Sequence, residues 1–164
     1  MAKKVHKNQT DGSLEGIEQA LTRTEQFIED NSKNISYVIF GVIAVVLIFI
    51  GVKRFYVDPL EEEASSQMYL AEKFFEQDSF NYALNGYGNY PGFIQVIEDY
   101  GITKTANLAK YYAGVSSLNI GDYEQAIDYL KDFKTDDLLI GAAKFSSLGD
   151  AYVESGDFSA AVGA

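Results

Sequence analysis

One apolar stretch dominates the pattern of hydrophobic and polar positions along the chain. Residues 35–52 are 18 consecutive uncharged positions, and they separate a polar N-terminal tail from a longer segment of mixed character. As a helix rising about 1.5 Å per residue, this stretch covers about 27 Å, close to the hydrocarbon thickness of a bilayer. It predicts one transmembrane helix over residues 35–57, with interfacial aromatic side chains at Tyr37, Phe55 and Tyr56.

A cleaved signal peptide and a buried core helix are the alternative interpretations of this stretch, and both fit less well. A signal peptide has a short basic start and a small-residue cleavage site, whereas this leader carries six acidic residues and Lys53 and Arg54 follow the stretch directly. A core helix has polar residues at helical spacing, and residues 38–52 have none.

The tail, residues 1–34, contains a narrow apolar stripe at helical spacing. Its members are Leu14, Ile17, Leu21 and Ile28. A stripe this narrow forms no core, so we expect an amphipathic helix that packs against a partner helix or the membrane surface. The acidic residues of the tail disfavour an anionic surface, so a partner helix is the preferred interpretation. A frayed, solvated helix is the alternative.

A further helix is expected to begin immediately after the apolar stretch. Asp58, Pro59 and Glu61 have the spacing of an N-cap, a proline in the first turn and a capping-box glutamate. From there to the end of the chain the pattern is helical, and Pro91 and several glycines mark the expected breaks between helices. No alternating strand pattern is present in this segment.

An internal repeat decides the expected fold of this C-terminal part. Residues 121–127 read Gly-Asp-Tyr-Glu-Gln-Ala-Ile, and residues 156–162, 35 positions later, read Gly-Asp-Phe-Ser-Ala-Ala-Val. A weaker copy begins at Phe80, 43 residues before the next, with Asp78 in place of the glycine. The excess of about eight residues fits a loop over residues 85–92, which is rich in Gly, Asn and Pro. A period of this length is typical of a helical solenoid.

These units resemble the tetratricopeptide repeat (TPR), in which two antiparallel helices need a small residue where they cross. Gly114 and Gly149 occupy that position, and Ala126 and Ala161 occupy the position where a neighbouring helix packs closely. The resemblance implies an all-α fold in which a single N-terminal transmembrane helix is followed by a TPR-like α-solenoid over residues 58–164. Because the sequence ends inside a second helix, we expect this domain to be truncated at its C-terminus. A generic array of helical hairpins is the alternative.

The charge balance narrows the range of partners. The chain has 24 acidic and 13 basic residues and a net charge of −11, and most of the imbalance lies in residues 58–164. An acidic domain disfavours nucleic acid and anionic lipid headgroups, which both need basic patches. The chain has no cysteine, which excludes disulfides and thiolate chemistry.

Orientation follows from basic residues near the membrane span. The counts on its two sides are nearly equal, but the short tail also carries Lys3, Lys4 and Lys7. Under the positive-inside rule, the flanking segment richer in Lys and Arg stays in the cytoplasm, and long translocated domains count for little. We therefore expect a cytoplasmic N-terminus and a periplasmic C-terminal domain.

The sequence offers few candidate catalytic or metal-binding residues. His6 is the only histidine and lies in the tail, and the three consecutive glutamates at 61–63 point in different directions on a helix. The aspartates at 136–137 are expected to cap the helix that follows, and the Gly-x-Gly at 86–88 lacks the context of a phosphate loop. We therefore expect no catalytic residue, no metal site and no cofactor.

Binding remains as the expected role, and two surfaces are candidates. By resemblance to TPR proteins, the first helices of the repeats line a groove for a partner or client. Its predicted residues are Tyr111, Val115, Ser146, Asp150 and Val153. The alternative is that the tyrosines fill the solenoid core. In the membrane, Gly41, Ala44 and Gly51 form a small-residue face where another transmembrane helix could approach.

The overall organisation resembles the ancillary subunits of the bacterial SecYEG translocon. More closely, three segments resemble membrane-anchored TPR proteins of Bacteroidota type. They are residues 21–30 (Leu-Thr-Arg-Thr-Glu-Gln-Phe-Ile-Glu-Asp), 83–93 (Ala-Leu-Asn-Gly-Tyr-Gly-Asn-Tyr-Pro-Gly-Phe) and 111–114 (Tyr-Tyr-Ala-Gly). The resemblance implies an inner-membrane adaptor beside the Sec channel that contacts emerging secreted chains or periplasmic chaperones.

Two other functions fit the same pattern. One is a structural scaffold of another envelope secretion or assembly complex, held by the face of Gly41 and Ala44. The other is an envelope-stress regulator that acts through the tail residues Leu14, Ile17 and Leu21.

Overall fold

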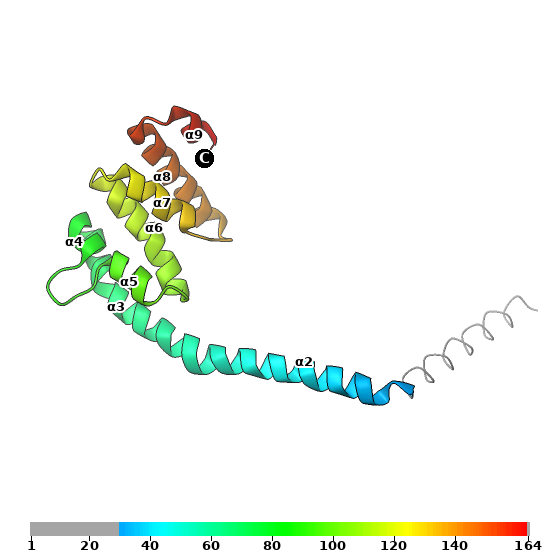
Figure 1. Cartoon of the computed structure of the whole chain (residues 1–164). Helices are drawn as coiled ribbons and strands as arrows, with labels where there is room; N and C mark the ends of the chain where they lie inside the picture. Colours follow the sequence, from blue (N-terminus) through cyan, green and yellow to red (C-terminus); the bar gives the residue numbers. More distant parts are fainter. Residues whose placement is uncertain (1–29, 164) are drawn as a thin grey trace, which may run out of the picture. The chain divides into compact units, whose positions relative to one another are not determined.

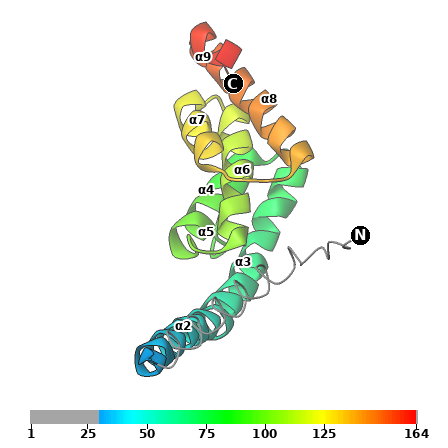
Figure 2. The same cartoon turned by 90° about the vertical axis from the view of Figure 1, so that its right-hand side faces the viewer.

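The computed structural model describes residues 30–163, and the predicted all-α fold is confirmed over that range (Figures 1 and 2). The only β-type pairing among these residues is an isolated bridge between Tyr87 and Tyr90. The chain divides into two compact units, Met1–Ile50 and Gly51–Ala164, which are described separately.

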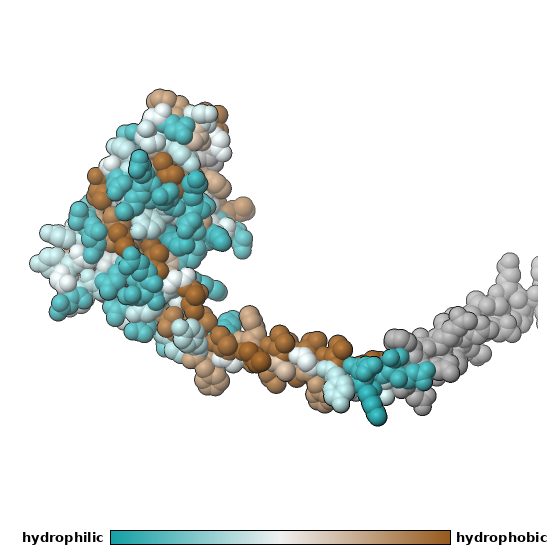
Figure 3. Space-filling model, viewed as in Figure 1, coloured by the Kyte–Doolittle hydropathy of each residue, from teal (hydrophilic) through white to brown (hydrophobic). Residues whose placement is uncertain are grey.

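The first unit contributes most of α2 (Ser32–Val52), which holds the apolar stretch. None of its residues is buried, and its large apolar side chains from Tyr37 to Val52 are 47% to 76% exposed. The helix is mostly brown in the hydropathy view of Figure 3. By length and composition it is the one candidate membrane-spanning helix in the described part of the chain, near the N-terminus. A core helix of a soluble protein is mostly buried, so that alternative does not fit.

The second unit begins with a distorted helical turn. The turn η1 (Lys53–Val57) is a π-helix, and the Asp58 N–H donates to the carbonyl of Lys53, five residues earlier. Pro59 follows in the first turn of α3 (Asp58–Glu76), where it lacks an N–H and its ring crowds the carbonyl four residues before it. The wider π turn accommodates this proline because it already departs from the regular α-helical ladder.

The predicted capping box at this point is wrong. Val57 has helical angles (φ −75°, ψ −44°), and no side chain caps the start of α3. The backbone N–H groups there already have helical partners, so Asp58 is free to pair with Arg54 at 3.3 Å. The carboxylate of Glu61 binds a helix 43 residues later in the sequence.

Helical hairpins follow in sequence, each packed on its neighbours. The remaining elements are α4 (Phe80–Asn85), α5 (Phe93–Asp99), α6 (Lys104–Asn119), α7 (Tyr123–Asp132), α8 (Leu138–Ser155) and α9 (Phe158–Gly163). The pairs are α3 with α4, α6 with α7, and α8 with α9. In addition, α6 contacts α3, α4, α5 and α8, so it lies at the centre of the unit (Figure 1).

The turns that close the three pairs have the same backbone geometry. In each, one N–H donates to the carbonyl five residues earlier at 2.9 Å: Ser79 to Phe74, Asp122 to Ser117, and Asp157 to Tyr152. The preceding residue is left-handed, with φ of 55° at Asp78, 84° at Gly121 and 85° at Gly156. Aspartate tolerates this conformation better than most residues, which explains how the weaker copy of the repeat keeps its turn without glycine.

The main core lies where α3, α4, α5 and α6 meet. The loop at residues 86–92 separates α4 from α5, and both short helices pack on α3 and α6. Eight buried residues form this cluster: Met68, Ala71, Ala83, Leu84, Phe93, Val96, Ala109 and Ala113. The predicted loop therefore divides the second helix of the first hairpin into two short helices, α4 and α5.

The crossing of α6 and α7 needs glycine at position 114. A Cβ there would lie 2.6 Å from Cγ of Leu130, so the helices approach more closely than any other residue allows. Ala126 is also fully buried in this pair. In the next pair, the expected close approach at Gly149 is absent, since a Cβ there would meet no atom within 4 Å. Ala161 is only half-buried, because the short α9 packs on α8 alone among the described helices.

Glu61 of α3 caps the N-terminus of α6. Its carboxylate accepts hydrogen bonds from the N–H of Lys104 at 2.7 Å, from the N–H of Thr105 at 2.9 Å and from the hydroxyl of Thr105 at 2.7 Å. Partial burial alone would raise the pKa of Glu61, but these hydrogen bonds and the charge of Lys104 lower it below its ordinary value of 4.5. This contact links the first hairpin to the second.

We expect Glu61→Gln to destabilise the second unit by about 1 kcal/mol at pH 7, because charge at a helix N-terminus is lost together with a hydrogen bond. The folded-state pKa is lowered, so the contribution is fully present above the unfolded pKa near 4.5 and is lost as the pH falls through the folded value. Urea unfolding of the full chain in detergent, followed by circular dichroism at pH 7 and below pH 4, measures both effects. Glu62→Gln is the control, since Glu62 is exposed and has no hydrogen bond among the described residues; an equal loss in both variants would contradict the capping role.

Candidate binding groove

The first helices of the second and third hairpins, α6 and α8, lie side by side and run parallel. Two hollows between them establish this arrangement. Side chains near the start of α6 share one hollow with side chains near the start of α8, and those near the two ends share the other. Position 108 of α6 therefore lies near 140 of α8, and position 119 lies near 150, so the two helices are in register. We refer to the surface of α6 and α8 that holds both hollows as the groove.

The short connection after α7 fixes this register. Asn107 of α6 holds the connection through Lys134, donating to its carbonyl at 2.7 Å and accepting from its N–H at 3.1 Å. Lys144 of α8 donates to the carbonyl of Phe133 at 2.7 Å. Asp137 caps α8, as predicted, by accepting from the N–H groups of the next helical turn at 2.8 and 3.0 Å.

One end of the groove is an apolar hollow of about 270 Å³. Its lining is Leu108, Tyr111, Tyr112, Leu139, Ile140 and Ala143. Leu139 is 83% exposed and Ile140 is 38% exposed, so large apolar surface faces solvent here. Exposed apolar side chains that gather around one hollow make it a candidate interaction site.

The two tyrosines in this hollow have different roles. Tyr112 belongs mainly to the core, where its ring stacks on Phe93 with centroids 5.3 Å apart and contacts Phe75 at 5.0 Å. Burial raises the pKa of its hydroxyl above the ordinary value, and the nearby Glu72 acts in the same direction. Tyr111 is half-buried and is held from the side by Phe133, with ring centroids 5.5 Å apart. Tyr112 thus packs in the core, as the alternative interpretation of the tyrosines expected, and a role of Tyr111 in binding stays a prediction.

The other end of the groove is an acidic hollow of about 440 Å³. It is lined by Leu118, Asn119, Tyr123, Asp150, Val153 and Glu154. Asp150 and Glu154 are exposed and lie one helical turn apart on α8. Neither forms an ion pair with any residue between 30 and 163.

Three of the five predicted groove residues line one of the two hollows. Tyr111 lines the apolar hollow, and Asp150 and Val153 line the acidic one. Val115 is half-buried and Ser146 is exposed, at positions between the two hollows. Several lining residues were not predicted from the sequence, above all Leu139, Ile140 and Glu154. Glu154 could have been found from its four-residue spacing to Asp150, which places both on one helical face.

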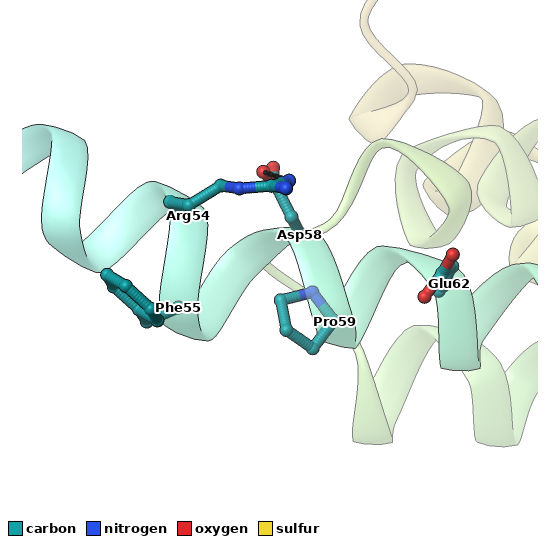
Figure 4. A pocket seen from close by; sticks show the side chains of 5 residues that line it. All are labelled: Arg54, Phe55, Asp58, Pro59 and Glu62. Atoms are coloured by element: carbon teal, nitrogen blue, oxygen red, sulfur yellow. Dashed lines mark hydrogen bonds and ion pairs between the residues drawn. The ribbon is translucent and has the colours of Figure 1, made fainter.

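A separate open hollow of about 500 Å³ lies along η1 and the start of α3 (Figure 4). Arg54 and Asp58 meet on one side of the helix, and Phe55 and Pro59 form an adjacent row, with Glu62 further along. Its single cation already has a carboxylate partner. Phe55 is 84% exposed and Tyr56 is 59% exposed, as suits the interfacial positions predicted for them.

The small-residue face of α2 is open. Ala44 is exposed, and a Cβ added at Gly41 or Gly51 would meet no atom within 4 Å. The tail residues Leu14, Ile17, Leu21 and Ile28 lie outside the described residues. Within residues 30–163, no three His, Cys, Asp or Glu residues gather as potential metal ligands.

Comparison of the chain with protein-family models, with curated proteins and with solved structures gave no match.

Proposed function

We propose that this protein is a membrane-anchored adaptor without enzymatic activity, in which a TPR-like array of helical hairpins binds a partner or client protein. The observation that carries the proposal is the open groove between α6 and α8, with its exposed Leu139 and its unpaired Asp150 and Glu154. Three equivalent turns at residues 78, 121 and 156 support the TPR-like interpretation of the hairpins.

The proposed anchor is α2, which crosses the bacterial inner membrane once with the N-terminus in the cytoplasm. Its exposed apolar surface and the aromatic residues Phe55 and Tyr56 support a span rather than a helix in water. The hairpins then lie in the periplasm, where the acidic surface favours rapid, transient contact with basic or unfolded segments.

The proposed partner is the Sec protein-translocation channel, and the proposed clients are emerging secreted chains or the chaperones that receive them. The support is the resemblance of residues 21–30, 83–93 and 111–114 to membrane-anchored TPR proteins, together with a single span that precedes the repeats.

A pull-down in mild detergent, with the full chain tagged at its C-terminus and partners identified by mass spectrometry, tests the proposal. Sec channel subunits at near-stoichiometric levels are the expected result. Recovery of a different envelope complex without Sec subunits would replace the adaptor with a scaffold. Recovery of no membrane protein above an untagged control would refute both proposals.

The open face of α2 favours the scaffold as a second candidate, because small residues allow transmembrane helices to pack closely. If the complex is held through this face, Gly41→Leu is expected to remove the membrane partners from the pull-down. Val46→Leu, on the opposite side of α2, is expected to retain them. Loss of partners in both variants, or in neither, would contradict a specific role for this face.

A further inference from the structure

The groove between α6 and α8 is polarised along its length. The apolar hollow lies at the N-terminal ends of both helices and the acidic hollow at their C-terminal ends. We propose that the groove binds an extended polypeptide segment that has one large apolar side chain and one Lys or Arg about four residues apart. This inference rests on the proposed function and specifies the chemistry of the ligand.

The apolar hollow is suited to a single large side chain. Its volume of about 270 Å³ is lined by aliphatic and aromatic side chains, with Tyr111 and Tyr112 on one wall and Leu139 and Ile140 on the other. Two of its basic neighbours are already engaged, since Lys110 pairs with Asp132 at 3.4 Å and Lys144 binds a backbone carbonyl. An apolar anchor therefore fits this end better than an anion does.

The acidic hollow is suited to a cation. Residues 114–125 and 146–158, which surround it, contain five acidic residues and no Lys or Arg. Two of the five, Asp122 and Asp157, accept hydrogen bonds from backbone N–H groups at the starts of α7 and α9. Asp150 and Glu154 have no such partner in the described structure, and they flank the apolar side chain of Val153. A Lys or Arg side chain has the matching combination of an apolar stem and a charged end.

The register of the helices sets the spacing in the ligand. Along α6, Tyr111 in the first hollow and Asn119 in the second are eight helical residues apart, or about 12 Å at 1.5 Å per residue. Along α8, Ile140 and Asp150 are ten residues apart, or about 15 Å. An extended segment covers about 3.3 Å per residue, so about four residues separate its two anchors. A helical ligand needs about eight residues for the same distance. Exposed Ser146, midway along the groove, offers a hydroxyl to the unpaired backbone of an extended segment.

Fluorescence anisotropy with the full chain in lipid nanodiscs tests the proposal. The probes are labelled peptides in a Ser/Gly background that carry one Phe and one Lys spaced by one, four or eight residues, each made in both sequence directions. The tighter direction at each spacing is compared. We expect the peptide with the four-residue spacing to bind on the order of tenfold more tightly than the other two peptides. Its affinity is expected to fall as the salt concentration rises.

Matched variants separate the two ends of the groove. Ile140→Ser is expected to abolish the advantage of Phe over Ser in the peptide, and Asp150→Asn with Glu154→Gln is expected to abolish the advantage of Lys over Ser. Asp128→Asn, an exposed acid on α7 outside both hollows, is the charge control and is expected to change neither. Equal losses in the control show attraction to net charge alone and overturn the proposal, as does tightest binding at one or eight residues.

The peptide-binding measurement tests the groove ligand separately from the partner that the pull-down identifies. If the peptides show no preference while the full chain still recovers its membrane partners, the groove assignment fails and the adaptor or scaffold function stands. If the pull-down recovers no partner but the four-residue peptide binds as expected, the groove ligand stands and the assigned partner fails.

Discussion

Phe93→Ala is expected to destabilise the helical unit by about 3–5 kcal/mol, the range for removing a fully buried aromatic side chain. Phe93 is 0% exposed at the start of α5, and its ring stacks on Tyr112 at 5.3 Å and meets Phe75 edge-on at 6.3 Å. Removing the ring leaves a cavity where α3, α5 and α6 meet. Because Tyr112 also lines the apolar hollow, peptide binding is expected to weaken as the core loosens.

The measurement is the urea midpoint of the full chain in detergent, followed by the loss of helical signal. Phe145→Ala is the matched control, since Phe145 lies on α8 with 51% of its surface exposed, and its loss is expected to change stability by less than about 0.5 kcal/mol. A similar midpoint shift in the two variants would show that the stack of Phe93 on Tyr112 contributes little to the core.

The repeat pattern predicted much of the fold because it encodes local backbone geometry. A small polar or glycine residue followed by an aromatic-x-x-Ala segment specifies a left-handed turn and the start of a second helix, and all three copies form that turn. The position of Phe93 was less predictable. It follows a loop that interrupts the helix, so no helical period connects it to Ala83 and Leu84 in the core that they share.

The capping-box prediction shows why a local motif can mislead. Asp58 and Glu61 have the right spacing, but the chain before them is already helical and leaves no free N–H for them to cap. Glu61 instead meets the free N–H groups at the start of α6, where Lys104 and Thr105 need an acceptor. A contact over 43 residues depends on the packing of α3 against α6, which spacing along the sequence does not reveal.

Only some of the residues that line the groove were predicted, because the pairing of its two helices also depends on contacts between distant parts of the sequence. The repeat period identified residues such as Tyr111 and Asp150 as members of first helices, but it gave no measure of how those helices pair. The apolar hollow depends on the connection at residues 133–137, which sets the register of α8 against α6. Leu139 and Ile140 were not predicted as lining residues, because the sequence does not show whether an apolar helix start is buried or exposed.

The two glycines at equivalent positions of the repeat are expected to respond oppositely to alanine. In Gly114→Ala the new Cβ would lie 2.6 Å from Cγ of Leu130 and 3.2 Å from its backbone N, so α7 has to move away from α6. Overpacking of this kind destabilises by about 1–3 kcal/mol, which exceeds the gain in helix propensity. The same shift moves the connection after α7 and is expected to weaken peptide binding in the groove.

Gly149→Ala is expected to stabilise the unit by about 0.5–1 kcal/mol, because Gly149 lies inside α8 with no atom within 4 Å of the added Cβ. Urea unfolding of both variants, measured against the unchanged protein under the same conditions, gives the sign directly. Destabilisation in both would mean that a further helix packs closely on α8 at Gly149 as α7 does on α6 at Gly114. Stabilisation in both would mean that the α6–α7 crossing is wider than the 2.6 Å approach to Leu130 implies.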